Sequence, residues 1–169
     1  SEASSTCTAC EAGKVAASVD STSCSVCAAG KFQSASGQSA CEDCAEGTSA
    51  SIPGSSSCSA CDAGTFSVVG AVNCSRCPSG TYSLTSASSC TSCSLGFHST
   101  SEASSTCTAC EAGKVAASVG STSCSACAAG KFQSASGQSA CENCTEGTSA
   151  SIPGSSSCSA CDAGTFSVV

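Results

Sequence analysis

Pairs of cysteines separated by two residues are the feature of this chain that could do chemistry. Such a Cys-x-x-Cys pair recurs ten times, and the pairs account for all 20 cysteines of the 169 residues. The first cysteines follow one another every 16 or 17 residues, at positions 7, 24, 41, 58, 74, 90, 107, 124, 141 and 158. Structural disulfides, zinc coordination and redox catalysis all use pairs of this spacing.

A disulfide framework fits the composition best. The 20 cysteines are about 12% of the residues, which exceeds the roughly 8–10% that marks disulfide scaffolds. There is no Trp or Met, one Tyr and five Phe, so apolar side chains cannot fill a conventional core and covalent bonds must replace it. A bond that closes about 15 residues stabilises the fold by roughly 3 kcal/mol in the chain-entropy model. We therefore expect a ladder of disulfides, formed in an oxidising compartment.

Zinc binding and redox catalysis are the alternatives. The spacing of successive pairs approaches that of zinc ribbons, which hold the metal with four thiolates. Redox catalysis needs an exposed thiol of low pKa at a helix N-terminus, and this chain offers no such context. The sole histidine, His98, is interpreted as an exposed loop residue rather than a ligand. We therefore expect no metal and no cofactor.

Charge and hydropathy exclude further classes of function. The net charge is −7, and the five Lys and Arg are scattered, so nothing in the sequence indicates nucleic-acid binding. No run of roughly 18 apolar residues is present, so this segment is not expected to span a membrane. A catalytic triad could use only the lone His98. We expect no enzymatic activity.

The elements that position the cysteines follow from the repeat unit, which reads Cys-x-x-Cys-x-x-Gly, then usually x-[Phe/Tyr/Val] and a Ser-rich tail. A glycine at the same place in every unit indicates a turn with positive φ. These turn glycines are Gly13, Gly30, Gly47, Gly64, Gly80, Gly96, Gly113, Gly130, Gly147 and Gly164. The Ser-rich stretches lack helical periodicity, so each unit is expected to form at most a short β-hairpin. The predicted fold is a small disulfide-rich tandem repeat, an elongated rod of about 17-residue units with little or no helix and no conventional hydrophobic core.

The units themselves repeat with a longer period of 100 residues, or six units. Residues 1–69 and 101–169 differ only at Asp20/Gly120, Val26/Ala126, Asp43/Asn143 and Ala45/Thr145. We interpret residues 1–6 as the tail of a preceding unit, 7–106 as one super-repeat and 107–169 as the start of the next. The chain is then expected to be a piece of a longer array.

The residues alone leave the disulfide pairing open. One rule treats all units alike and joins the second cysteine of a pair to the first cysteine of the next pair. That rule leaves Cys7 and Cys161 to bond outside the chain. A second rule joins first to first and second to second within blocks of two units, such as Cys7–Cys24 with Cys10–Cys27, and uses every cysteine internally.

The repeat resembles the ephrin-receptor-like cysteine-rich repeats of large extracellular proteins, including algal and protist surface or flagellar-hair proteins. Residues 27–32, 61–66 and 77–82 carry the clearest matches. The repeat also looks like loops of TNF-receptor and EGF modules, in which the next cysteine downstream closes a Cys-x2-Gly-x-aromatic segment. The resemblance implies the first rule: Cys10–Cys24, Cys27–Cys41, Cys44–Cys58, Cys61–Cys74, Cys77–Cys90, Cys93–Cys107, Cys110–Cys124, Cys127–Cys141 and Cys144–Cys158.

Several units depart from this pattern at the aromatic position. Val15, Ser49, Val115 and Ser149 stand there instead, and Phe97 is shifted by one residue. We expect the loops of these units to pack less tightly.

Two N-glycosylation sequons are present, at Asn73 and Asn143, each with cysteine in the middle position. Glycosylation there would compete with disulfide formation, and an unmodified Asn in a tight turn is the alternative. The Ser/Thr runs are candidates for O-glycans, or else a solvated surface.

The composition and the repeat favour a non-enzymatic structural protein. Repeated identical surfaces can make repeated identical contacts, so we expect self-association into an extracellular filament or surface coat. Recent duplication alone would also explain the identity of the copies. The other hypothesis is a rigid stalk of a receptor or adhesin whose binding domain lies outside this chain.

Overall fold

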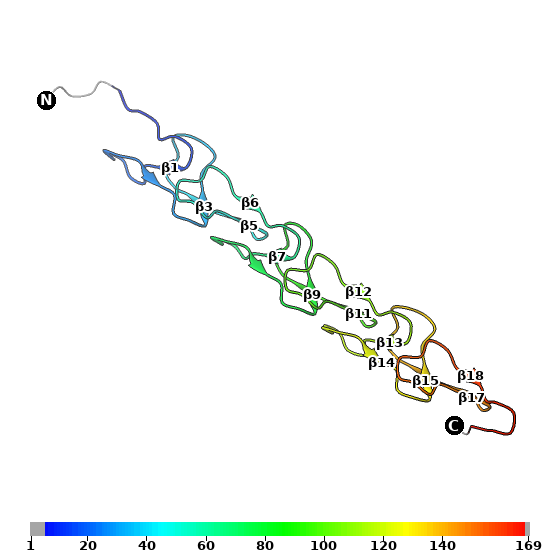
Figure 1. Ribbon diagram of the computed structural model, residues 1–169. Helices are drawn as coiled ribbons and strands as arrows, with labels where there is room; N and C mark the ends of the chain where they lie inside the picture. Colours follow the sequence, from blue (N-terminus) through cyan, green and yellow to red (C-terminus); the bar gives the residue numbers. More distant parts are fainter. Residues whose placement is uncertain (1–5, 168–169) are drawn as a thin grey trace. The chain divides into compact units, whose positions relative to one another are not determined.

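Residues 6–167 fold into nine two-stranded antiparallel hairpins and contain no helix (Figure 1). This computed structural model describes residues 6–167, so residues 1–5 of the expected preceding tail lie outside it. Each strand has two residues. The strands are β1 Lys14–Val15, β2 Ser25–Val26, β3 Lys31–Phe32, β4 Glu42–Asp43, β5 Thr48–Ser49, β6 Ser59–Ala60, β7 Thr65–Phe66, β8 Ser75–Arg76, β9 Thr81–Tyr82, β10 Thr91–Ser92, β11 Phe97–His98, β12 Thr108–Ala109, β13 Lys114–Val115, β14 Ser125–Ala126, β15 Lys131–Phe132, β16 Glu142–Asn143, β17 Thr148–Ser149 and β18 Ser159–Ala160. The predicted class of small disulfide-rich tandem repeat is confirmed.

Every hairpin joins two successive units. Its first strand follows the turn glycine, and its second strand consists of the two residues inside the next Cys-x-x-Cys. In the first hairpin, Lys14 faces Val26 and Val15 faces Ser25. The interval between cysteine pairs in the sequence therefore also sets the interval between successive hairpins.

A type II β-turn leads into each hairpin. In the first unit, the N–H of Lys14 donates to the carbonyl of Glu11 at 3.0 Å, and Gly13 has φ +80°. That turn type requires positive φ at its third residue, which glycine adopts without steric cost.

A second left-handed turn lies in each Ser-rich tail, and sequence reasoning missed it. Its positive-φ residues are Asp20, Gly37, Gly54, Gly70, Ser86, Ala103, Gly120, Gly137 and Gly154. Three of the nine are not glycine, so no invariant residue marked the position.

The core is built from cysteines rather than from a cluster of large apolar side chains. The largest fully buried side chains are all second cysteines of their pairs: Cys27, Cys44, Cys61, Cys77, Cys93, Cys110 and Cys127. Small residues three positions after the turn glycines, such as Ala50 and Ser67, are buried beside them. Val15 and Val115 are also buried, at 7% exposure each, so the looser packing expected at these two positions is wrong. A branched aliphatic side chain fits this site.

The chain divides into two compact units. One comprises residues 1–76 and 84–89, and the other comprises residues 77–83 and 90–169. Hairpins of the same kind occur in both. Across residues 6–167, no helix is long and apolar enough to cross a membrane.

Candidate functional site

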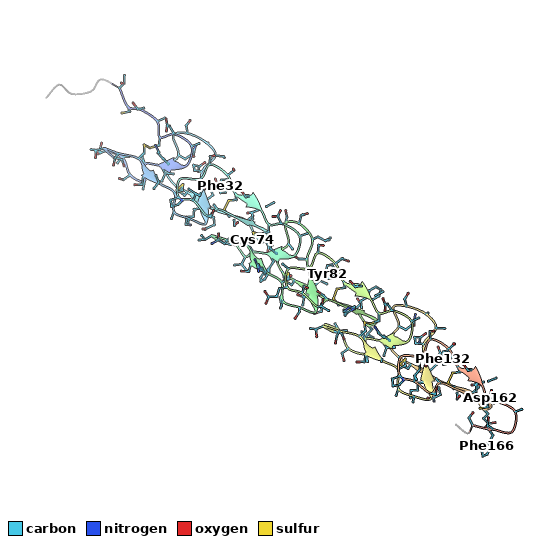
Figure 2. The ribbon with its side chains drawn as sticks, in the orientation of Figure 1. Phe32, Cys74, Tyr82, Phe132, Asp162 and Phe166 are labelled. Atoms are coloured by element: carbon cyan, nitrogen blue, oxygen red, sulfur yellow. A yellow bond between two sulfur atoms is a disulfide. The ribbon has the colours of Figure 1, made fainter. Side chains whose placement is uncertain are left out.

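The disulfide ladder is the most regular chemical feature of the structure (Figure 2). Each bond joins the second cysteine of one pair to the first cysteine of the next, with Cα atoms 5.6–5.8 Å apart. The bonds are Cys10–Cys24, Cys27–Cys41, Cys44–Cys58, Cys61–Cys74, Cys77–Cys90, Cys93–Cys107, Cys110–Cys124, Cys127–Cys141 and Cys144–Cys158. Within the described residues, the free thiols are Cys7, which is exposed, and Cys161, which is partly exposed. Eighteen oxidised sulfurs offer no thiolates for zinc.

Hairpin geometry explains why these cysteines meet. Cys24 directly precedes β2, and Cys10 lies just before the turn that leads into β1. Pairing of β1 with β2 therefore brings the two cysteines side by side, and the disulfide closes the loop that the hairpin forms.

Backbone hydrogen bonds attach each unit to the next one. The N–H of Gly13 donates to the carbonyl of Gln33 in the next unit at 2.7 Å. In the other direction, the N–H of Cys27 donates to the carbonyl of Gly13 at 2.9 Å, and the N–H of Gly37 donates to that of Cys10 at 2.8 Å. The second copy repeats all three bonds one hundred residues later, so the contact between units is a property of the repeat.

Several turn glycines also approach the unit two positions further along the chain. A Cβ atom built on Gly13 would lie 2.0 Å from the carbonyl oxygen of Gly54, and one on Gly113 would lie equally close to that of Gly154. No side chain fits there. These glycines serve both the left-handed turn and the packing of next-nearest units.

The buried polar side chains are satisfied internally. Gln33 is 5% exposed, and its side chain donates to the carbonyl of Ala40 at 2.8 Å while accepting from the N–H of Ala35 at 3.0 Å. Gln133 makes the corresponding bonds in the second copy. These hydrogen bonds hold the Ser-rich tails of these two units in place.

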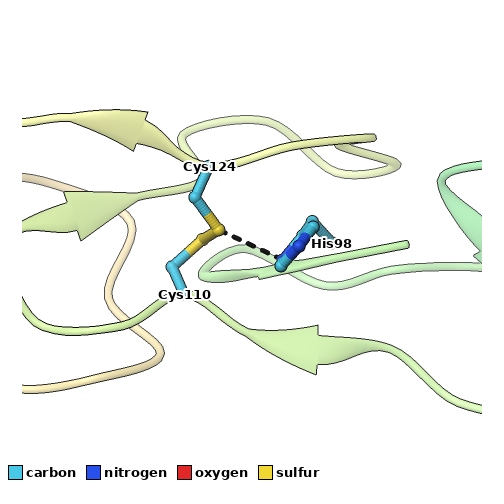
Figure 3. A group of neighbouring side chains, drawn as sticks. All are labelled: His98, Cys110 and Cys124. Atoms are coloured by element: carbon cyan, nitrogen blue, oxygen red, sulfur yellow. Dashed lines mark hydrogen bonds between the residues drawn. A yellow bond between two sulfur atoms is a disulfide. The ribbon is translucent and has the colours of Figure 1, made fainter. Parts of the chain in front are cut away.

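His98 lies in β11 and contacts a disulfide, which corrects its interpretation as an exposed loop residue (Figure 3). Its Nδ1 is 3.1 Å from the Sγ of Cys124 and 3.0 Å from the carbonyl oxygen of Thr108. The side-chain nitrogen and sulfur atoms of His98, Cys110 and Cys124 all lie within 4.8 Å of one another. Both sulfurs belong to one disulfide, so this group is not a metal site in the oxidised chain.

The position of His98 is the aromatic position of the repeat, two residues after the turn glycine Gly96. In the third unit Ser49 occupies the same position, and its Oγ is 3.4 Å from the Sγ of Cys74. The side chain at this position thus reaches the sulfur of a cysteine two units ahead. Counting from the glycine rather than searching for an aromatic residue would have found His98.

The sequon asparagines lie beside the ladder. Asn143 is exposed in β16 and faces Lys131, whereas Asp43 at the same place in the first copy forms an ion pair with Lys31 at 2.6 Å. Asn73 is also exposed. The middle cysteine of each sequon is disulfide-bonded in the structure, and glycosylation at Asn73 and Asn143 stays a prediction.

One protein family matches the chain. The model of the family described as "Tyrosine-protein kinase ephrin type A/B receptor-like" matches residues 13–61, 80–127 and 113–161, which together cover more than half of the chain. No curated protein matches it significantly.

Proposed function

This chain belongs to the ephrin type A/B receptor-like family of cysteine-rich repeats, and from that premise we propose that it is a structural component of an extracellular filament or surface coat. The nine disulfides support an oxidising location, because such bonds persist outside the cytosol. The family is a receptor-like structural module rather than a catalytic one.

The near identity of the two copies carries the proposal. The four differing positions, Asp20, Val26, Asp43 and Ala45, are all exposed in the first copy. The cysteines, the turn glycines and the buried positions are the same in both copies. A surface that recurs every 100 residues can make the same lateral contact repeatedly, as the subunits of a fibre or coat do.

The receptor-like character of the family favours a second candidate, the stalk of a receptor or adhesin. A stalk separates a binding domain from the cell surface and needs only stiffness and protease resistance. A disulfide in every unit provides both.

Immuno-electron microscopy of native surface material separates the two functions. The antibody should recognise residues 31–40, a segment that recurs unchanged 100 residues later at 131–140. Label at regular intervals along fibres or within a continuous coat supports the proposal. Label confined to isolated rods tipped by a globular head supports the stalk and overturns the filament.

A further inference from the structure

The disulfide Cys110–Cys124 differs from the other disulfides of residues 6–167 because a histidine contacts it (Figure 3). The chain contains one histidine, His98, and its Nδ1 lies 3.1 Å from the Sγ of Cys124. The equivalent contact to Cys74 is made by the neutral hydroxyl of Ser49, at 3.4 Å. The disulfide Cys110–Cys124 therefore has an acid–base group at one of its sulfurs, whereas the matched disulfide Cys61–Cys74 has none.

The two sulfurs of this disulfide differ in access. Cys110 is fully buried, at 0% exposure. Cys124 is partly exposed and lines a pocket together with His98, Thr108, Ala109, Glu111 and Lys114. An external nucleophile therefore reaches the Sγ of Cys124 and not that of Cys110.

The charge in this pocket depends on His98. The charged or titratable side chains that line it are His98, Glu111 and Lys114. Lys114 lies 3.6 Å from Glu111, so these two groups largely neutralise each other. Protonation of the imidazole then adds a net positive charge beside the disulfide, which attracts an incoming thiolate and stabilises the thiolate that leaves.

We propose that Cys110–Cys124 is the site at which this chain undergoes disulfide exchange with an external thiol, and that His98 is the acid of the reaction. A thiolate, R–S⁻, attacks the Sγ of Cys124, a bond forms between these two sulfurs, and the Cys110–Cys124 bond breaks. The electron pair passes to the Sγ of Cys110, which lies within 4.8 Å of a ring nitrogen of His98 and takes a proton from its imidazolium. The product is a mixed disulfide on Cys124 and a free thiol on Cys110. No other oxidant or reductant is consumed.

The test measures the reduction rate of each disulfide separately. The intact protein is treated with limiting glutathione, the freed thiols are alkylated at successive times, and peptides are quantified by mass spectrometry. Cys110–Cys124 is expected to open roughly fivefold or more faster than Cys61–Cys74, with glutathione attached to Cys124.

Two variants exchange the side chains of the matched sites. His98→Ser should slow the reduction of Cys110–Cys124 to the rate of Cys61–Cys74. Ser49→His should accelerate Cys61–Cys74 by the same factor. Unchanged rates at the disulfides remote from each substitution control for misfolding.

Equal rates at the two disulfides of the unaltered protein would overturn the proposal. So would a His98→Ser variant that reacts as fast as the parent, or glutathione attached to Cys110 instead of Cys124.

Discussion

At the scale of single residues, glycine has two separate roles in this chain. Gly113 has φ +83°, and a Cβ there would lie 2.0 Å from the carbonyl oxygen of Gly154. Gly54 has nearly the same φ, +81°, but the nearest atom to a Cβ added there is the Cγ1 of Val26 at 3.8 Å, an ordinary contact. Comparing these two glycines separates the effect of the positive φ from the effect of close packing against another backbone.

Gly113→Ala should therefore destabilise the protein more than Gly54→Ala. We expect a loss of about 1 kcal/mol for Gly54→Ala, from the left-handed backbone alone, and at least about 2 kcal/mol for Gly113→Ala. Guanidinium unfolding with the disulfides intact measures both. Equal losses would show that close packing against Gly154 contributes nothing.

The two copies also contain a natural substitution in the second turn. Asp20 has φ +62°, and Gly120 has φ +75° at the equivalent position, where a Cβ would have room. Asp20→Gly should stabilise the first copy, and Gly120→Asp should destabilise the second, each by about 0.5–1 kcal/mol. Thermal unfolding of the two variants checks the opposite signs, and two shifts of the same sign would contradict this account.

At the scale of elements, each two-residue hairpin depends on its disulfide. Two short strands alone do not form an independently stable structure in water. The bond between Cys44 and Cys58 closes the loop that contains β5, and β6 begins directly after Cys58. Covalent closure and the backbone bonds to neighbouring units supply what the strands lack.

Removing one disulfide should therefore act locally. In the double variant Cys44→Ala, Cys58→Ala, we expect a loss of about 3 kcal/mol and faster amide exchange in β5, β6 and the bonded Gly70. The distant hairpin β13–β14 should keep its protection. Ser56→Ala, an exposed change within the same loop, is the control and should alter neither quantity. Uniform loss of protection along the chain would mean that the array unfolds as one cooperative unit.

At the scale of the whole molecule, a disulfide links each unit to the next along the described residues. The cysteines left unbonded there are Cys7 and Cys161. If the cysteines held zinc instead, a chelator would remove the metal and expose thiolates that react with an alkylating agent. Chemical labelling of the thiols distinguishes the two interpretations.

Alkylation of residues 1–169, produced as an isolated chain, followed by intact mass spectrometry should label Cys7 and Cys161, which the pairing rule leaves to bond outside these residues. Treatment with a strong chelator should add no label, and reduction should add 18 more, since nine bonds are present. Extensive labelling after chelation alone would instead identify bound metal.

Much of this structure follows from local sequence. The periodic cysteines predict the unit length, the recurring glycine predicts a turn, and the absence of helical periodicity predicts short hairpins. These features depend on residues close together in the chain, and steric limits on φ or loop closure act on them directly.

Tertiary structure alone decided the contacts between units. The left-handed turn at Gly120, whose N–H donates to the carbonyl of Cys93 at 2.8 Å, and the approach of His98 to Cys124 both involve residues from other units. No local pattern encodes such distances, because they arise only when successive hairpins are bonded to one another. The sequence by itself therefore determined the unit and its repetition. The folded chain determined which side chain contacts which disulfide, and therefore which disulfide differs chemically from the rest.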